Sequence, residues 1–88
     1  MYTVYTKSGC RYCALVKELL DELGEPVIYM NCDEELLNDK ETLLNSLEKK
    51  AGRPHKTFPM VFLDGEFVGG FIELMRLTTT QSKEPHYK

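Results

Sequence analysis

The sequence predicts a small α/β domain, and two patterns in it carry that prediction. Short apolar runs rich in β-branched and aromatic residues alternate with longer segments whose apolar residues recur at helical spacing. The chain has 88 residues, which is enough for one hydrophobic core but too few for two. We therefore expect a single domain spanning residues 1–88, with one site.

The first half of the chain is predicted to form a strand, a helix and a second strand. Tyr2–Thr6 is rich in aromatic and β-branched residues, so it is predicted to be a short buried strand. Apolar residues recur at helical spacing over Arg11–Leu23, and Gly24 supplies a stop. Val27–Met30 is too short for a helix and is predicted to run parallel to the first strand. The result is a βαβ unit with Cys10 at the mouth of its helix.

The second half is predicted to add a helix and a hairpin. Asn38 and Glu41 resemble an N-cap pair, and a helical stripe follows them until Gly52. Phe58–Leu63 and Glu66–Val68 are strand-like, and the Asp-Gly pair between them suits a type I′ turn. These two strands should therefore be antiparallel neighbours.

Composition and charge argue against several classes of function. The formal net charge is -3, whereas proteins that grip nucleic acid neutralise many phosphates with Lys and Arg. The sequence contains neither an apolar run of about 20 residues nor a recognisable signal peptide. We expect a cytoplasmic monomer that binds neither nucleic acid nor membrane. In that compartment a Cys-x-x-Cys pair is more often redox-active or metal-binding than structural.

The run Cys10-Arg11-Tyr12-Cys13 is the candidate catalytic site. A loop delivers Cys10 to the first helical turn, where unpaired backbone N–H groups and the helix dipole favour a thiolate. Lys7 adds a positive charge, whereas Cys13 lies on the apolar stripe and is expected to stay protonated. Cys10 is therefore predicted to be the nucleophile that attacks a disulfide, and Cys13 the residue that resolves the mixed disulfide.

Two other interpretations of the cysteine pair stay open. A zinc site needs about four ligands, and the remaining donors are unpaired in sequence: Cys32, His55 and His86. Two inert core cysteines are the second alternative, although a loop after a strand is a poor place to bury a thiol. We expect no metal, assign no role to Cys32, and expect both histidines to be solvated, because exchange through an ionised thiol needs no base.

Two later segments are candidates for the other half of the site. Pro59 falls in a strand that otherwise looks central, where proline is disfavoured. If the Phe58-Pro59 bond is cis, the backbone of Phe58 can pair with an extended thiol peptide; the alternative is an ordinary edge-strand proline. Gly69-Gly70 precedes a third helical stretch whose N-terminus can hold a carboxylate. We expect the chain to fray from about residue 79 to its end at 88.

These motifs together resemble the glutaredoxin family, in particular its small dithiol members and its short phage-type forms. Lys7-Ser8-Gly9-Cys10-Arg11-Tyr12-Cys13, Thr57-Phe58-Pro59 and Gly69-Gly70 occur in the family's order and at about its separations. The resemblance covers essentially the whole chain. It implies a thioredoxin-like fold, a four-stranded mixed sheet flanked by three helices. It also implies glutathione as co-substrate, with the first cysteine glutathionylated and then rescued by a second glutathione.

The resemblance further implies a glutathione site drawn from three parts of the chain. The residues that would flank the tripeptide and pair with its cysteine backbone are Lys7, Tyr12, Phe58 and Pro59. Those that would meet its γ-glutamyl end are Gly70, Phe71 and Ile72. The glycine carboxylate would be met by Arg53 or Lys56.

The chain departs from the family pattern at two positions. Arg11 replaces the usual proline, which should alter the redox poise; some dithiol members without it bind a 2Fe–2S cluster bridged by two monomers and glutathione. Ile72 stands where a small or polar residue is usual and accepts no hydrogen bond from the γ-glutamyl amine.

The resulting hypothesis is a glutathione-dependent oxidoreductase that reduces glutathione mixed disulfides and protein disulfides, such as that of ribonucleotide reductase. Its alternatives are a reductant fed by thioredoxin reductase and a glutathione-ligated 2Fe–2S carrier. The cluster is not expected as the main state. A third alternative is an interaction module with incidental cysteines.

Overall fold

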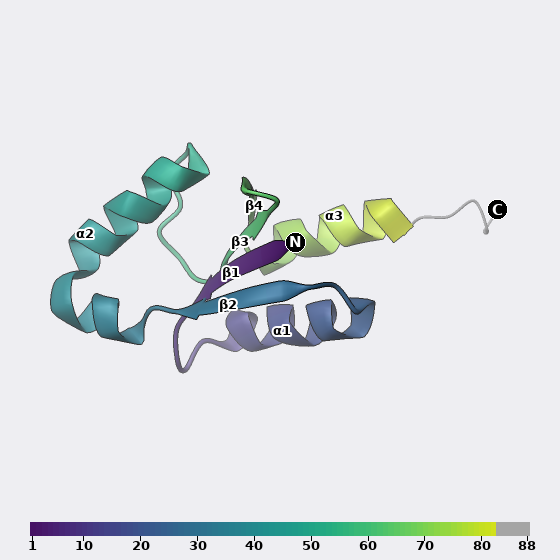
Figure 1. Ribbon diagram of the computed structural model, residues 1–88, viewed down its shortest axis with the longest axis horizontal. Coiled ribbons are helices and arrows are strands. Elements are labelled where there is room, and N and C mark those ends of the chain that lie inside the picture. Colours follow the sequence, from purple (N-terminus) through teal and green to yellow (C-terminus); the bar gives the residue numbers. More distant parts are fainter. Residues whose placement is uncertain (83–88) are drawn as a thin grey trace.

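The computed structural model describes residues 1–82, which form one sheet with helices on both of its faces (Figure 1). The strands are β1 (Tyr2–Thr6), β2 (Val27–Asn31), β3 (Met60–Leu63) and β4 (Glu66–Gly69). The helices are α1 (Arg11–Leu23), α2 (Asp33–Ala51) and α3 (Phe71–Ser82). The strand order is β2-β1-β3-β4, with β1 parallel to β2 and antiparallel to β3, and β3 antiparallel to β4. The predicted four-stranded mixed sheet with three helices is confirmed.

Alternation along the central strands divides the core into two clusters. Val61 faces the cluster that α1 and α3 cover, where it packs with Val4, Leu20 and Leu74. Its neighbours Met60 and Phe62 face the other cluster, which α2 covers with its leucines. Successive side chains of a strand point to opposite faces, so β3 supplies both clusters. The sheet is thus held between α2 on one face and the pair α1 and α3 on the other.

The predicted first helix is confirmed at both of its ends. Its buried residues are Cys13, Val16 and Leu20, which lie on one face at helical spacing. The chain leaves the helix at Gly24, whose φ of 69° is left-handed and whose N–H bonds the carbonyls of Leu20 and Asp21. Glycine adopts that conformation with little steric cost, which explains the sharp stop.

The predicted start of the second helix at Asn38 is wrong. The helix begins at Asp33 and breaks at Asp39, where φ is -158° and ψ is 83°. The carboxylate of Asp39 accepts bonds from the N–H and hydroxyl of Thr42, so Asp39 caps the second part of α2. Apolar periodicity did not reveal the turns before Asp39, because these turns bury few side chains. Leu37, for example, is 87% exposed.

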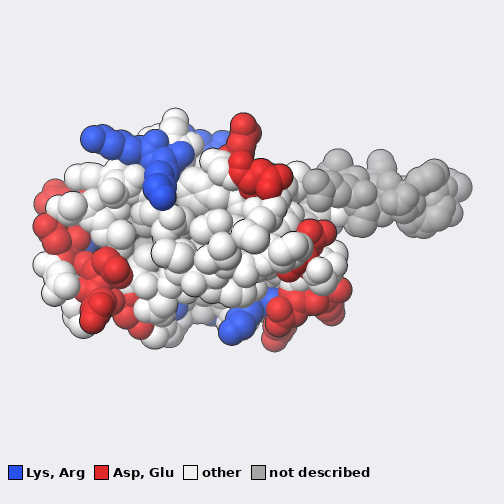
Figure 2. Space-filling model, viewed as in Figure 1, with Lys and Arg blue, Asp and Glu red and all other residues white. Residues whose placement is uncertain are grey.

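Charge offers an independent reason for the early start of α2. Its first turn carries Asp33, Glu34 and Glu35, and its last turn carries Lys49 and Lys50. Figure 2 shows the two signs separated on this face, with red atoms toward the start of α2 and blue atoms near its end. This distribution complements the helix dipole and is the signal that periodicity missed.

The predicted hairpin is confirmed, although β3 begins later than expected. Asp64 and Gly65 have φ of 52° and 88°, the positive values that a type I′ turn requires at both central residues. β3 starts at Met60 instead of Phe58, since Pro59 has no N–H for the ladder. β3 lies between β1 and β4, so the interpretation of Pro59 as an edge-strand proline is wrong.

The third helix extends further than the sequence suggested. It continues to Ser82, so the tail expected from about residue 79 is wrong for residues 79–82, and residues 83–88 lie outside the described part. Thr78 near this end is buried, and its hydroxyl donates to the Leu74 carbonyl of the same helix at 3.0 Å. Within residues 1–82, no helix combines the length and apolar character needed to cross a bilayer.

Candidate active site

Cys10 is the N-cap residue of α1, as its place in the sequence predicted. Its φ of -105° and ψ of 111° are extended, and its Sγ accepts the Cys13 N–H at 3.1 Å. Cys10 is half-buried, whereas Cys13 is 6% exposed on the core face of the helix. The two are joined as a disulfide with their Cα atoms 5.2 Å apart. Cys10 is therefore the more exposed of the two cysteines, and the N–H beside its sulfur favours the thiolate after reduction.

The loop before Cys10 is tied to the junction between β2 and α2. The Ser8 N–H donates to Asp33 Oδ1 at 2.8 Å, and the Ser8 hydroxyl donates to Asp33 Oδ2. These two bonds are the main cause of a lowered pKa at the Asp33 carboxyl, with Lys7 contributing a smaller attraction. The Cys32 N–H bonds the Thr6 carbonyl at 2.8 Å and closes the same junction. The nucleophile thus follows a loop with a fixed anchor.

The Phe58 backbone lies directly beside Cys10. The Phe58-Pro59 peptide bond is cis, and the Phe58 carbonyl oxygen lies 3.7 Å from Cys10 Sγ. Lys7 Nζ is 5.9 Å from the centre of the Phe58 ring. Two segments predicted from the sequence therefore converge: the loop that carries Lys7 and Cys10, and the Phe58-Pro59 pair.

An open groove of about 220 Å³, which we call the groove, extends from this point. Six of the predicted glutathione-site residues line it: Tyr12, Phe58, Pro59, Gly70, Phe71 and Ile72. Three further lining residues had no predicted role: His55, Thr57 and Glu73. A second hollow of about 270 Å³ shares Thr57 and Phe58 with the groove, and Lys7 and Lys56 line it. Three lysines, Lys7, Lys40 and Lys56, thus line a hollow beside the groove, and the lining of the groove itself is partly apolar and partly polar.

A glutaredoxin family model matches residues 2–68 of the chain. A glutaredoxin of Vernicia fordii is 37% identical over 67 residues, covering 76% of this chain and 61% of the plant protein. Glutaredoxin 1 of Rickettsia bellii is 36% identical over 75 residues, covering 84% of this chain and 72% of the bacterial protein. The chain belongs to the glutaredoxin family.

Solved glutaredoxin structures agree with this assignment. Glutaredoxin 1 from Francisella tularensis, complexed with cacodylate, has a TM-score of 0.80 at 25% identity and covers 94% of this chain and 96% of that one. A buckwheat glutaredoxin–glutathione complex has a TM-score of 0.71 at 29% identity and covers 91% of this chain and 69% of that one. The protein is therefore a thiol–disulfide oxidoreductase of thioredoxin-like fold, with a Cys10–Cys13 redox pair.

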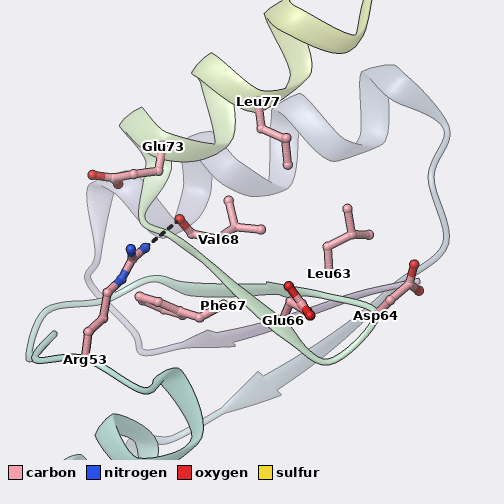
Figure 3. Close-up of a pocket in the computed structure, with 8 residues that line it drawn as sticks. All are labelled: Arg53, Leu63, Asp64, Glu66, Phe67, Val68, Glu73 and Leu77. Carbon is pink, nitrogen blue, oxygen red and sulfur yellow. Dashed lines mark hydrogen bonds between the residues drawn. The ribbon is translucent and has the colours of Figure 1, made fainter.

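Arg53 is not among the residues that line the groove of this glutaredoxin. Its guanidinium carbon is 4.8 Å from the centre of the Phe67 ring, and its Nη2 donates to the Val68 carbonyl at 3.2 Å. It lines another open hollow, of about 720 Å³, which shares Glu73 with the groove. Figure 3 shows Arg53 reaching toward Val68. Of the two cations suggested for a glycine carboxylate, Lys56 is the one that shares a hollow with Phe58, and its Nζ lies 3.1 Å from Glu48.

Glu73 is a groove residue that the sequence reasoning did not assign. Its Oε1 accepts the Gly70 N–H at 2.8 Å, and this bond is the largest cause of its lowered pKa. The carboxylate is thus ionised at the start of α3, three residues after the residue that precedes the helix. That spacing, an acid three residues after the cap, is a signal that was available in the sequence.

His55 was expected to be solvated, and the structure instead half-buries it at the groove. The His55 ring packs edge-on against Phe67 with centres 5.0 Å apart, and the His55 backbone N–H donates to Glu48 at 3.1 Å. The local sequence of the loop does not predict this position, because it depends on the contact with Phe67, which comes from β4. His86 lies outside the described residues.

The remaining cysteine is a free thiol that does not line the groove. Cys32 is buried at the start of α2, and burial raises the pKa of its thiol. Across residues 1–82, no three His, Cys, Asp or Glu side chains gather closely enough to hold a metal ion. The half-buried Cys10 also differs from an inert core cysteine, since its sulfur lies beside the Phe58 carbonyl next to the groove.

Proposed function

We propose that this glutaredoxin uses glutathione as its reductant and reduces both glutathione mixed disulfides and protein disulfides. The observation that carries the proposal is the groove beside Cys10: Phe58 lines it, and the Phe58 carbonyl oxygen lies 3.7 Å from Cys10 Sγ. A short extended thiol peptide fits there with its cysteine at the reactive sulfur and its backbone paired to Phe58. A cytoplasmic location, where reduced glutathione is abundant, belongs to the same proposal.

The electrostatics of the groove support a tripeptide with a charged group at each end. Lys7 and Lys56 supply positive charge beside Phe58, suited to a carboxylate. Ile72 provides no acceptor for the γ-glutamyl amine, but the ionised Glu73 lines the same groove. The departure noted at Ile72 is therefore offset by an acceptor one residue further along α3.

The chemistry on a glutathione mixed disulfide takes two exchanges. The Cys10 thiolate attacks the glutathione sulfur of the mixed disulfide. The thiolate of the substrate protein leaves, and a Cys10–glutathione disulfide forms. The thiolate of a second glutathione then attacks the bound glutathione sulfur. Oxidised glutathione leaves, and the Cys10 thiolate is regenerated.

A protein disulfide uses both cysteines. Cys10 attacks one sulfur and forms a mixed disulfide with the substrate, after which Cys13 attacks Cys10 Sγ and releases the reduced protein. The product is the Cys10–Cys13 disulfide, the state that the structure holds. Two glutathione molecules then return the pair to the dithiol. A disulfide of ribonucleotide reductase is one substrate of this class that we propose.

The decisive experiment is glutathione-coupled turnover of a glutathione–peptide mixed disulfide. We expect the wild-type protein and Cys13→Ser to turn over and Cys10→Ser to fall to the uncatalysed rate, because only the first cysteine is needed for this substrate. Cys32→Ala is the matched control and should keep the wild-type rate. Turnover that survives in Cys10→Ser would refute the proposal.

Two alternatives are separated by further measurements. If turnover with thioredoxin reductase exceeds turnover with glutathione, thioredoxin reductase and not glutathione supplies the electrons. The exposed Arg11, which stands in the first turn of α1 where proline is usual, motivates a test for a glutathione-ligated 2Fe–2S cluster. Anaerobic reconstitution that yields neither iron nor sulfide would remove that alternative.

A further inference from the structure

Charge enters the lining of the groove at two residues. Among the nine described residues that line it, Glu73 is the one carboxylate and His55 is the one side chain that can become cationic. His55 comes from the loop before β3, and Glu73 comes from the first turn of α3. The groove therefore combines an acid and an imidazole from separate elements.

Both side chains lie beside Gly70. A Cβ at Gly70 would be 3.5 Å from Glu73 Oε1 and 4.0 Å from His55 Cε1. The groove reaches the reactive sulfur at Phe58, whose carbonyl oxygen is 3.7 Å from Cys10 Sγ. A ligand that reacts with Cys10 and runs along the groove from Phe58 to Gly70 therefore meets both groups.

The imidazole of His55 is held in place but keeps a ring nitrogen for a ligand. The ring packs edge-on against Phe67, and the backbone N–H of His55 donates to Glu48. Nε2 lies 3.5 Å from the hydroxyl oxygen of Thr57, which is long for a hydrogen bond. A ligand acceptor that approaches Nε2 more closely replaces this weak contact at little cost.

Groups of both signs surround the imidazole. Lys56 Nζ lies 3.1 Å from Glu48, so the carboxylate that remains to face His55 in the groove is that of Glu73. Hydrogen bonds are the largest cause of the lowered pKa of both carboxyls, and the charge of His55 is a smaller one. The titratable and charged groups near His55 are Glu48 of α2, Glu73 of α3, Tyr12 of α1, and Lys56 and Arg53 of its own loop, the last on the same Phe67 ring.

The γ-glutamyl end of glutathione is a free α-amino acid, which carries an ammonium and a carboxylate. The ionised Glu73 suits the ammonium. The carboxylate is repelled by Glu73, and the Gly70 N–H beside it is already bonded to Glu73 Oε1 at 2.8 Å. His55 is the groove residue whose charge attracts that carboxylate.

We infer that His55 is a specificity-determining residue, whose imidazolium holds the carboxylate of the α-amino-acid end of glutathione and makes its recognition depend on pH. The inference rests on the proposed function and adds a residue to it. Histidine side chains ordinarily gain their charge as pH falls from 8 to 5. Recognition of the carboxylate should therefore strengthen over that range.

The test compares three tripeptides that differ only at this end. Glutathione carries both groups, 4-aminobutyryl-Cys-Gly lacks the carboxylate, and glutaryl-Cys-Gly lacks the ammonium. Each is joined through its cysteine to thionitrobenzoate and mixed with reduced Cys13→Ser protein. The Cys10 thiolate attacks the tripeptide sulfur, a Cys10–tripeptide disulfide forms, and thionitrobenzoate leaves as a coloured anion with the electron pair of the broken bond. The ratio of two rate constants at one pH cancels the ionisation of Cys10.

We expect the ratio of the glutathione rate to the aminobutyryl rate to rise about threefold from pH 8 to pH 5.5, an ordinary size for a partly solvated charge pair. His55→Gln, made in the Cys13→Ser protein, should abolish this rise, whereas His55→Lys should keep the ratio high at every pH. The ratio of the glutathione rate to the glutaryl rate should stay unchanged in His55→Gln, because both substrates carry the carboxylate. Lys56→Ala is the matched control: this cation does not line the groove, so its loss should slow all three substrates alike.

Three results would overturn the inference while the glutathione substrate still reacts, leaving the proposed function intact. The first is an aminobutyryl ratio that stays constant with pH when His55 is present. The second is an aminobutyryl ratio that His55→Gln leaves unchanged at pH 5.5. The third is a His55→Gln variant that alters both ratios equally, which would mean that the imidazole has only a structural role. A glutathione substrate that reacts no faster than with Cys10→Ser would overturn the proposed function too.

Discussion

Ser8 and Asp33 are joined by two hydrogen bonds across 25 positions of sequence, one from the backbone N–H of Ser8 and one from its hydroxyl. The carboxylate lies at the first residue of α2, and the donors lie two residues before Cys10. A helix start on one side of the sheet thus anchors the loop that delivers the nucleophile on the other. Because its two ends are far apart in sequence, this link depends on the tertiary fold.

Removing this anchor should slow the reaction of Cys10. We expect Asp33→Ala to lower the rate of Cys10 alkylation by roughly tenfold at neutral pH, because a small misplacement of a reacting group is costly. Asp33→Asn keeps an oxygen acceptor and should stay within about twofold of wild type. The rate is followed with iodoacetamide on the reduced protein between pH 5 and pH 9.

Asp39→Ala is the matched control for that experiment. Its carboxylate also accepts an N–H and a hydroxyl, both from Thr42, but it caps α2 and not the cysteine loop. We expect it to destabilise α2 and leave the alkylation rate unchanged. Equal slowing by Asp33→Ala and Asp39→Ala would mean that the Ser8 link has no special role.

Lys56 and Arg53, which the family resemblance suggests as alternative partners of a glycine carboxylate, should behave differently. We expect Lys56→Ala to raise the KM for a glutathione mixed disulfide about threefold at low salt, an ordinary size for a solvated charge pair. Arg53→Ala should leave that KM unchanged, since its guanidinium packs on Phe67 and bonds Val68. Steady-state kinetics at two salt concentrations distinguishes them; a larger rise in KM for Arg53→Ala would contradict the geometry.

The elements with strong local signals were predictable from the sequence, and those fixed by distant contacts were not. Gly24 and the Asp64-Gly65 pair mark their turns because positive φ restricts the residue type, and both predictions are confirmed. The sequence predicted the cap at Asn38, one residue before the break that the structure has at Asp39. Asn and Asp are equally good caps by residue type, so only the fold selects between them.

The site shows the same division. Cys10 was located because a strand, a loop and a helix are contiguous in sequence around it. The bond from Glu73 to Gly70 is local, so its signal was available in the sequence, whereas the position of His55 depends on Phe67 from β4. The direction of the Arg53 side chain likewise depends on the β4 carbonyl that it reaches. Periodicity carries no information about such contacts.

Acid should destabilise the fold. Four carboxyl groups have a pKa lowered by hydrogen bonds or cations in the folded state: Asp33, Asp39, Glu48 and Glu73. A folded pKa below the unfolded value gives stability that is complete above the unfolded pKa, near 4, and is lost as pH falls through the folded pKa. We expect the free energy of unfolding in urea to fall steadily from about pH 5 to about pH 2.

Replacing one of these groups tests the source of that slope. Glu73→Gln retains an oxygen acceptor for the Gly70 N–H but no longer titrates, so its stability should depend less steeply on pH over the same range. Glu66→Gln is the control, an exposed carboxylate on β4 that should keep the wild-type slope. A wild-type stability that stays constant or rises on acidification would contradict the assignment.

Gly69 should be the glycine least tolerant of substitution. Its φ is 133°, and a Cβ there would lie 2.7 Å from the Cβ of Glu73, the side chain that caps α3. Gly69→Ala therefore combines backbone strain with a clash, and we expect it to lower the free energy of unfolding by about 3 kcal/mol. Because the clash displaces Glu73 from the groove, the KM for a glutathione mixed disulfide should rise as well.

Gly52→Ala is the matched control, since its φ of 79° is also positive but a Cβ there meets nothing within 4 Å. It should cost about 1 kcal/mol and leave the KM unchanged, because it carries only the strain. Equal losses of stability in the two variants, with equal KM values, would show that the contact with Glu73 contributes nothing.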